Sequence, residues 1–354
     1  MITIEELLGI AAQNGASDVH ITVGVPPKMR INGALHNMDY PALFPQDTEP
    51  IIMSIMDRRR KEIFDETGEV DFSISVPQIG RYRVNIFKQR GSMAASLRVV
   101  GTEIPTADSL GVPKAVQELY SKRRGLVLVT GPTGSGKSTT LASLINLINS
   151  ERTDHIITLE DPIEYLHNHK KSMVNQREIG LDTMSYAAAL RAALREDPDV
   201  ILVGEMRDLD TISIAITAAE TGHLVFSTLH TIGAASTIDR VIDVFPTHQQ
   251  QQIRIQLSMV LEAVISQQLI PTADGKGRVA AFEVMLANAA VKNMIREGKT
   301  YQIQSMIQTN GKLGMITMDD ALYNLYRMGK ITGEQALIFA QDQQAVEKRL
   351  RGYM

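Results

Sequence analysis

The chain contains no cysteine and no tryptophan, and aromatic residues make up only 5% of its 354 residues. Without cysteine, disulfides, cysteine-ligated zinc and iron–sulfur clusters are excluded, and nothing indicates an oxidising compartment. No apolar run approaches the roughly 18 residues that a membrane-spanning helix needs. The N-terminus, Met1-Ile2-Thr3-Ile4-Glu5-Glu6, is acidic and unlike a secretory signal. We therefore predict a soluble cytoplasmic protein that contacts a membrane only through a partner or a surface.

The chain also lacks a large excess of positive or negative charge. The 36 basic and 40 acidic residues give 36 − 40 = −4 with histidine neutral. This balance, and the absence of a basic stretch interleaved with aromatic residues, argue against a nucleic-acid motor. Hydrophobic residues make up 44% and charged residues 21%, which is typical of globular proteins. The length is sufficient for two domains, each with its own core.

The first hundred residues have the pattern of a small α+β domain. Thr3 and Glu6 form a predicted capping box ahead of an amphipathic helix that ends at Asn14-Gly15. The pattern then predicts strands over 18–23 and 28–31, a helix over 47–66, and a meander over 70–76, 81–89 and 94–100. The segment 101–113 holds two glycines and two prolines and is predicted to be a linker. We expect the first domain to span 1–100.

A different pattern follows, in which apolar strands alternate with helices. We predict strands over 125–130, 156–159, 200–203 and 224–228, and helices over 138–149 and 186–195. Strands with near-continuous apolar residues indicate a parallel sheet covered on both faces. From residue 234 the chain has a mostly helical pattern, interrupted by a hairpin-like turn at 275–277 before 278–286. We expect an α/β domain over 114–354, with a helical C-terminal subdomain from about residue 288.

The strongest motif has the Walker A form GxxxxGK[ST], and it lies between an apolar strand and a helix. In such a P-loop the glycines let backbone N–H groups surround phosphate groups, next to the partial positive charge of a helix N-terminus. Lys137 reaches the β- and γ-phosphates and the Ser138 hydroxyl binds Mg²⁺. The predicted nucleotide-binding residues are Gly131, Pro132, Thr133, Gly134, Ser135, Gly136, Lys137, Ser138 and Thr139.

Polar side chains also follow other predicted strands. Glu205 comes after Gly204, one residue beyond the usual position of the acid in such enzymes, and is predicted to hold Mg²⁺ or to polarise water. Glu160, Asp161 and Glu164 are crowded, which fits either a metal and water site or a solvated acidic loop. His230 is placed to sense the γ-phosphate. The general base stays open among the three glutamates, because coupled carboxylates share their protons.

These motifs occur in the order found in the secretion-type (type II/IV) ATPase superfamily, which the chain resembles. The segments 15–20, 26–27 and 30–33 also match, so the resemblance covers essentially the whole chain. Within it, the chain is most similar to type IV pilus retraction motors: it lacks a long N-terminal extension and the CxxC pairs of many assembly motors. It also has a segment similar to their AIRNLIRE sequence, which departs from it at Val291, Lys292 and Met294. The segment consists of Ala290, Val291, Lys292, Asn293, Met294, Ile295, Arg296 and Glu297.

The resemblance implies a homohexameric Mg²⁺-dependent ATPase with a PAS-like N-terminal and a RecA-like C-terminal domain, and ATP bound between them. It implies that this motor drives pilus retraction and twitching motility from the cytoplasmic side of the inner membrane. Its partners would be a pilus platform protein and, indirectly, pilin, with no nucleic acid. Arginines that reach nucleotide across interfaces are expected, and the candidates are Arg81, Arg83, Arg195, Arg207 and Arg240. The alternatives are a pilus assembly or type II secretion motor, or an accessory protein that binds ATP without hydrolysing it.

Overall fold

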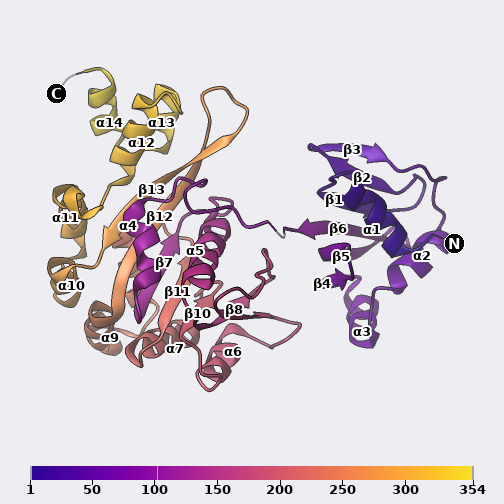
Figure 1. The fold of residues 1–354 in the computed structure, drawn as a ribbon, viewed down its shortest axis with the longest axis horizontal. Coiled ribbons are helices and arrows are strands. Elements are labelled where there is room, and N and C mark those ends of the chain that lie inside the picture. Colours follow the sequence, from indigo (N-terminus) through magenta and orange to yellow (C-terminus); the bar gives the residue numbers. More distant parts are fainter. Residues whose placement is uncertain (1, 102, 353–354) are drawn as a thin grey trace. The chain divides into compact units, whose positions relative to one another are not determined.

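The computed structural model describes residues 2–101 and 103–352. The chain forms two compact units (Figure 1). The first comprises Met1–Glu103 with Pro162–Leu166, and the second comprises Ile104–Asp161 with His167–Met354. Over the described residues, no helix combines the length and apolar character that crossing a bilayer requires.

The first unit is built on an antiparallel sheet whose described strands run in the order β3-β2-β1-β6-β5-β4. Alternation along β5 places Tyr82, Val84 and Ile86 in the core, as the meander pattern predicts. The strand after the Asn32-Gly33 turn was not predicted. The elements are α1 Ile4–Gln13, β1 Asp18–Ile21, β2 Lys28–Ile31, β3 Ala34–Asn37, α2 Pro45–Met53, α3 Arg58–Thr67, β4 Glu69–Val76, β5 Gly80–Gln89 and β6 Ser92–Val100.

The single helix predicted over 47–66 is wrong, because the structure has two helices there. Asp57 interrupts the helical run: its backbone is extended and its carboxylate accepts a hydrogen bond from the Arg60 amide at 2.8 Å. This cap begins α3, which ends at Gly68 in the left-handed conformation. The amphipathic pattern therefore continues from one helix to the next, and the capping residue Asp57 is the signal in the sequence that a new helix begins.

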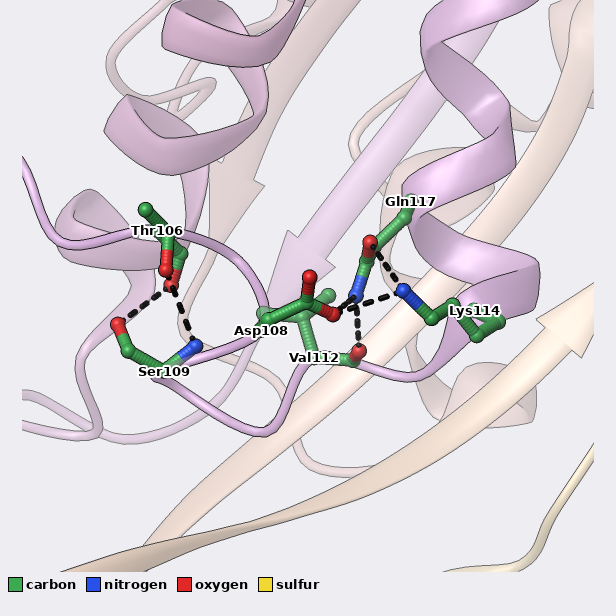
Figure 2. Close-up of polar contacts among 6 residues, drawn as sticks. All are labelled: Thr106, Asp108, Ser109, Val112, Lys114 and Gln117. Atoms are coloured by element: carbon green, nitrogen blue, oxygen red, sulfur yellow. Dashed lines mark hydrogen bonds and ion pairs between the residues drawn. The ribbon is translucent and has the colours of Figure 1, made fainter.

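Residues 104–113, within the predicted linker, are folded onto the second unit (Figure 2). The Asp108 carboxylate accepts hydrogen bonds from Lys114 Nζ at 2.8 Å and Gln117 Nε2 at 3.0 Å, and Gln117 also donates to the carbonyl of Val112. Ser109 bonds both the hydroxyl and the carbonyl of Thr106. Val112 is buried among apolar residues of the second unit. Glycine and proline thus shape a constrained connection here. It leads into α4 Lys114–Gln117 and η1 Glu118–Ser121.

The second unit contains a mostly parallel sheet whose described strands follow the order β13-β12-β7-β11-β10-β8-β9. Only β13 pairs antiparallel, with β12. The α/β fold class predicted from the sequence is confirmed. Two strands, β9 and β12, were not predicted, and β12 lies in the region expected to be mostly helical. The strands are β7 Gly125–Thr130, β8 His155–Glu160, β9 Met173–Glu178, β10 Val200–Val203, β11 Leu224–Leu229, β12 Leu261–Pro271 and β13 Arg278–Leu286.

Alternation along β7 directs its side chains into two cores, one on each face of the sheet. Val127 and Val129 pack with α5, whereas Leu126 and Leu128 face the core that α6 to α10 cover. A further small core joins the C-terminal helices to the β12–β13 hairpin. Figure 1 labels these helices α12, α13 and α14. The helices are α5 Lys137–Glu151, α6 Tyr186–Ala193, α7 Leu209–Glu220, α8 Ala234–Asp243, α9 Thr247–Val260, α10 Ala289–Arg296, η2 Thr300–Gln302, α11 Ile303–Thr309, η3 Gly311–Leu313, α12 Met318–Arg327, α13 Gly333–Phe339 and α14 Gln343–Leu350.

Candidate nucleotide-binding site

The P-loop joins the end of β7 to the start of α5. Gly131, Gly134 and Gly136 all have positive φ angles, of 142°, 79° and 86°. At Gly131 a side chain is also excluded by space, because a Cβ atom there would lie 2.2 Å from the carbonyl oxygen of Gln267. The loop therefore takes its shape from glycine at the two motif positions, 131 and 136, and at the variable position 134.

Lys137 is held inside this loop. Its side chain is buried, and Nζ donates hydrogen bonds to the carbonyls of Gly131 at 2.8 Å and Pro132 at 3.0 Å. The Ser135 hydroxyl is buried in the same loop, and within residues 2–101 and 103–352 it has no hydrogen-bond partner. A buried ammonium and an unsatisfied hydroxyl beside a helix N-terminus suit the oxygens of a phosphate group.

Gln267 supports the P-loop from β12, and sequence reasoning missed it. Its Oε1 accepts a hydrogen bond from the Thr140 hydroxyl at 2.8 Å, and its carbonyl packs against Gly131. The side chain is only 2% exposed. The available signal was the polar triplet 266–268 inside an apolar run, since buried polar groups in such a run need specific partners.

Glu205 and His230 meet at the carboxyl ends of the neighbouring strands β10 and β11. Glu205 Oε1 lies 2.9 Å from His230 Nε2 and 2.7 Å from Arg207 Nε. Burial alone would raise the pKa of Glu205, but the hydrogen bonds with Arg207 and His230 and the electrostatic interaction with these two side chains lower it below its usual value. Arg207 and His230 therefore favour the ionised form of the Glu205 carboxylate.

A cavity of about 340 Å³ opens at this cluster. It brings together four of the predicted site residues, Glu205, Arg207, His230 and Arg240. The remaining lining residues are Met206, Ile212, Leu229, Thr231 and Val244. Strand ends that are separate in the sequence thus form one concave site, as is typical of parallel sheets.

The other candidate arginines lie elsewhere. Arg195 is exposed after α6, and its Nη1 donates to the carbonyl of Arg191 at 3.1 Å; it does not line the cavity that contains Glu205. Arg81 and Arg83 belong to β5 of the first unit. Arg81 lines a shallow cavity there together with the β4–β5 turn and Leu166, and Arg83 is exposed.

The predicted acidic cluster is divided between the two units. Glu160 ends β8, where its Oε1 accepts hydrogen bonds from the Thr158 hydroxyl at 2.6 Å and from Gln176 Nε2 at 3.0 Å. Asp161 follows it and is exposed. Glu164 is also exposed, but it lies in Pro162–Leu166, which belongs to the first unit. Glu160 is accordingly satisfied by local hydrogen bonds.

Tyr186, the first residue of α6, is a further member of the site that sequence reasoning missed. A Cβ atom on Gly204 would lie 2.8 Å from the Tyr186 hydroxyl oxygen, so glycine gives this hydroxyl space at the end of β10. Burial raises the pKa of Tyr186 well above its usual value, and the nearby charges of Asp161, Glu205 and Glu160 raise it further. Tyr186 thus stays a neutral hydroxyl among carboxylates.

A P-loop beside a Glu–Arg–His cluster, at one edge of a mostly parallel sheet, defines a nucleotide-binding α/β protein. The chain belongs to the type II/IV secretion system protein family, whose sequence model matches residues 1–347. The resemblance inferred from the motifs is therefore confirmed.

Individual relatives resemble the chain over nearly their whole length. It is 50% identical over 333 residues to a Pseudomonas aeruginosa protein named "Type IV pilus retractation ATPase PilT", covering 94% of this chain and 96% of the relative. It is 49% identical over 320 residues to a Neisseria gonorrhoeae "Twitching motility protein", covering 90% and 86%. The crystal structure of "the Pilus Retraction Motor PilT and Bound ADP" matches with a TM-score of 0.91 and 52% identity, covering 98% of this chain and 100% of that one.

Proposed function

We propose that this chain is an ATP-hydrolysing motor that retracts a type IV pilus and so produces twitching motility. The likeness to the retraction ATPase of Pseudomonas aeruginosa and to the ADP-bound motor structure supports this function. The observation on which the proposal depends most is the placement of Lys137, Glu205 and His230. They follow the carboxyl ends of β7, β10 and β11, Lys137 through the P-loop, and these strands are neighbours in the order β7-β11-β10 in one sheet. A P-loop and an activating acid at one sheet edge are what phosphoryl transfer requires.

Each residue of the site has a proposed task. The P-loop, Gly131 to Thr139, surrounds the phosphates with backbone N–H groups, and Lys137 binds the β- and γ-phosphate oxygens. Glu205 orients the attacking water and receives its proton, and Arg207 and His230 hold this carboxylate in place. His230 changes its contacts when the γ-phosphate is lost. Arg240, on the same cavity, is available to stabilise negative charge on the transferred group.

Mg²⁺ is the proposed cofactor. Within residues 2–101 and 103–352, no group of three or more His, Asp or Glu side chains is arranged to hold a metal. Mg²⁺ bound with a nucleotide takes one or two protein oxygens, together with phosphate oxygens and water. The Ser138 hydroxyl and the Glu205 carboxylate are oxygen donors of this kind, so the residues present fit the ion. When bound with ATP, it neutralises charge on the phosphates.

We further propose that the two units are a PAS-like and a RecA-like domain and that six chains form a ring. ATP would then bind between domains, with Arg81, Arg83 or Arg195 reaching it across an interface and Glu160, Asp161 and Glu164 near the water. The proposed partners are an inner-membrane pilus platform protein and, through it, pilin. The proposed location is the cytoplasmic side of the pilus base.

Steady-state phosphate release by the purified full-length chain tests the function. Lys137→Ala and Glu205→Ala are each expected to lower ATP turnover by at least about two orders of magnitude. Lys312→Ala and Glu334→Ala are matched controls, because they remove the same charges at exposed positions and should leave turnover unchanged. Wild-type protein that binds ATP but releases no phosphate would instead favour the accessory, non-hydrolysing alternative.

A further inference from the structure

Glu283, in the middle of the edge strand β13, is a buried carboxylate with no part in the mechanism described so far. Its side chain is 0% exposed, and none of the ion pairs among the described residues includes it. Oε1 accepts a hydrogen bond from the Ala234 amide at 2.8 Å. Oε2 accepts from the Met318 amide at 3.3 Å and from Gln341 Nε2 at 3.4 Å. Burying such a group is costly unless these donors hold it in a defined position.

One of these donors lies next to the loop of the candidate catalytic site. Ala234 is the first residue of α8, which directly follows the loop that carries His230 and Thr231. Ser266, the cross-strand partner of Glu283, anchors the same loop by accepting a hydrogen bond from the Gly233 amide at 3.0 Å. The hydroxyl oxygen of Thr231 in the loop lies 2.7 Å from that of Thr237 in α8. The β12–β13 hairpin therefore fixes where α8 begins, and with it the position of His230.

The other donors belong to the C-terminal helices. Met318 is the first residue of α12, and Gln341 lies between α13 and α14. Asp319, next to Met318, accepts hydrogen bonds from the amides of Gln341 at 2.7 Å and Asp342 at 3.0 Å. The catalytic loop and the C-terminal helices are thus joined through one carboxylate.

We propose that Glu283 is a positioning residue for ATP hydrolysis. It holds the start of α8 so that His230 meets Glu205. The proposal rests on the function proposed above for Glu205 and His230. Because the P-loop is shaped by Gly131, Lys137 and Gln267 and makes none of these contacts, Glu283 should affect turnover and not nucleotide affinity.

The test compares kcat for ATP with the dissociation constant for ADP in Glu283→Ala, both measured on the full-length chain. We expect kcat to fall at least about tenfold while ADP affinity changes by less than about twofold. Glu283→Gln keeps one carbonyl oxygen for the Ala234 amide, so its kcat should lie between those of Glu283→Ala and wild type. Asp319→Asn is the matched control, since Asp319 anchors the C-terminal segment and makes no hydrogen bond to α8; its kcat should stay near wild type.

The non-additivity of two changes separates positioning from a general loss of structure. In a His230→Ala background, adding Glu283→Ala should lower kcat by no more than about twofold, because Glu283 acts through the same loop. A Glu283→Ala protein with wild-type circular dichroism and wild-type kcat would overturn the proposal. Loss of ADP affinity in step with kcat would also overturn it, and so would an equal loss in Asp319→Asn.

Two milder changes cover the case in which Glu283→Ala does not fold. Ser266→Ala and Glu283→Gln each weaken one anchor of the loop, and each should lower kcat several-fold without weakening ADP binding. Unchanged kcat in both would refute the positioning role. A wild-type chain that releases no phosphate would instead refute the proposed function itself, so the two failures are distinguishable.

Discussion

Replacing Gly131 by alanine tests whether close contact between β7 and β12 shapes the nucleotide site. Two penalties apply to this change. The residue has φ of +142°, which L side chains rarely adopt, and its new Cβ would lie 2.2 Å from the Gln267 carbonyl oxygen and 2.8 Å from the Ser135 hydroxyl. The first penalty is about 1–3 kcal/mol. The second is overpacking against the backbone of a neighbouring strand, which costs about 1–3 kcal/mol.

Gly134→Ala is the control because it carries a backbone penalty without overpacking. Gly134 has φ of +79°, and no atom lies within 4 Å of the point that a Cβ would occupy there. The gain from restricting the unfolded chain is the same for both variants and cancels. The difference between them is therefore the overpacking term together with the greater backbone strain at φ of +142°, which lies outside the left-handed α region. At about 2–4 °C per kcal/mol for a unit of this size, overpacking alone should make Gly131→Ala melt about 2–12 °C below Gly134→Ala, and the extra strain adds to this difference.

Scanning calorimetry without nucleotide measures this difference directly, and the absence of tryptophan makes intrinsic fluorescence a poor substitute. The transition of the second unit is the one expected to move, because both glycines lie in it. Equal melting temperatures for the two variants would show that β12 gives way without cost. In that case Gln267 would not set the shape of the P-loop.

Three further predictions concern other parts of the second unit. Gln267→Leu leaves the buried Thr140 hydroxyl without its acceptor and should destabilise the second unit by about 1–3 kcal/mol. Adding Thr140→Val removes the unsatisfied hydroxyl and should restore part of the lost stability in thermal melts. If no stability is recovered, the hydrogen bond between Thr140 and Gln267 does not have this role. Burial, with a smaller contribution from the charge of Lys170, lowers the pKa of His167 from 6.5 to about 4, so its neutral form stabilises the fold above pH 6.5 and this contribution is lost as the pH falls through about 4. Thermal melts at pH 7 and pH 4.5 should therefore show that the wild type loses more stability on acidification than His167→Gln does. The difference should reach up to about 3 kcal/mol at the lower pH. Equal losses of stability in the two proteins would show that His167 is not responsible. Arg296 is exposed in the segment 290–297, so Arg296→Ala should abolish twitching while ATP turnover stays within about twofold of wild type. Ile295 is fully buried, so Ile295→Ala opens a cavity and should impair both twitching and ATP turnover. If Arg296→Ala lost twitching and ATP turnover together, the segment would be structural.

The sequence predicts elements well where hydrophobic period and capping agree. β7, β10 and α1 begin and end where the pattern places them, or within one residue of it, because each has clear end signals. β12 could not be assigned in this way, since an apolar run interrupted by three polar residues fits a helix or a strand. Its identity is settled by pairing with β7 on one side and β13 on the other.

The residues of the candidate site also fall into two groups, those that local sequence predicts and those that it does not. The P-loop and Glu205 could be predicted because local motifs carry them, and His230 because it follows an apolar strand. Local sequence does not identify the partners of Gln267 and Tyr186, since each acts through a neighbour elsewhere in the sequence; for Gln267 the polar triplet 266–268 shows only that some partner is needed. In the predicted segment 290–297, Val291 and Ile295 on α10 are buried. The resemblance to the AIRNLIRE sequence does not tell buried residues of this segment from exposed ones.

The short segment Pro162–Leu166 limits how the gene can be divided. It lies between two parts of the second unit, yet it is a piece of the first, where Tyr165 forms a β-bridge with Gly101 and Ile163 is 3% exposed. A fragment that stops at residue 103 lacks this piece. A fragment that starts at residue 104 carries it without its surroundings and presents Ile163 to water. Separate expression of either half therefore calls for a redesigned stretch at 162–166, or for both halves to be produced together.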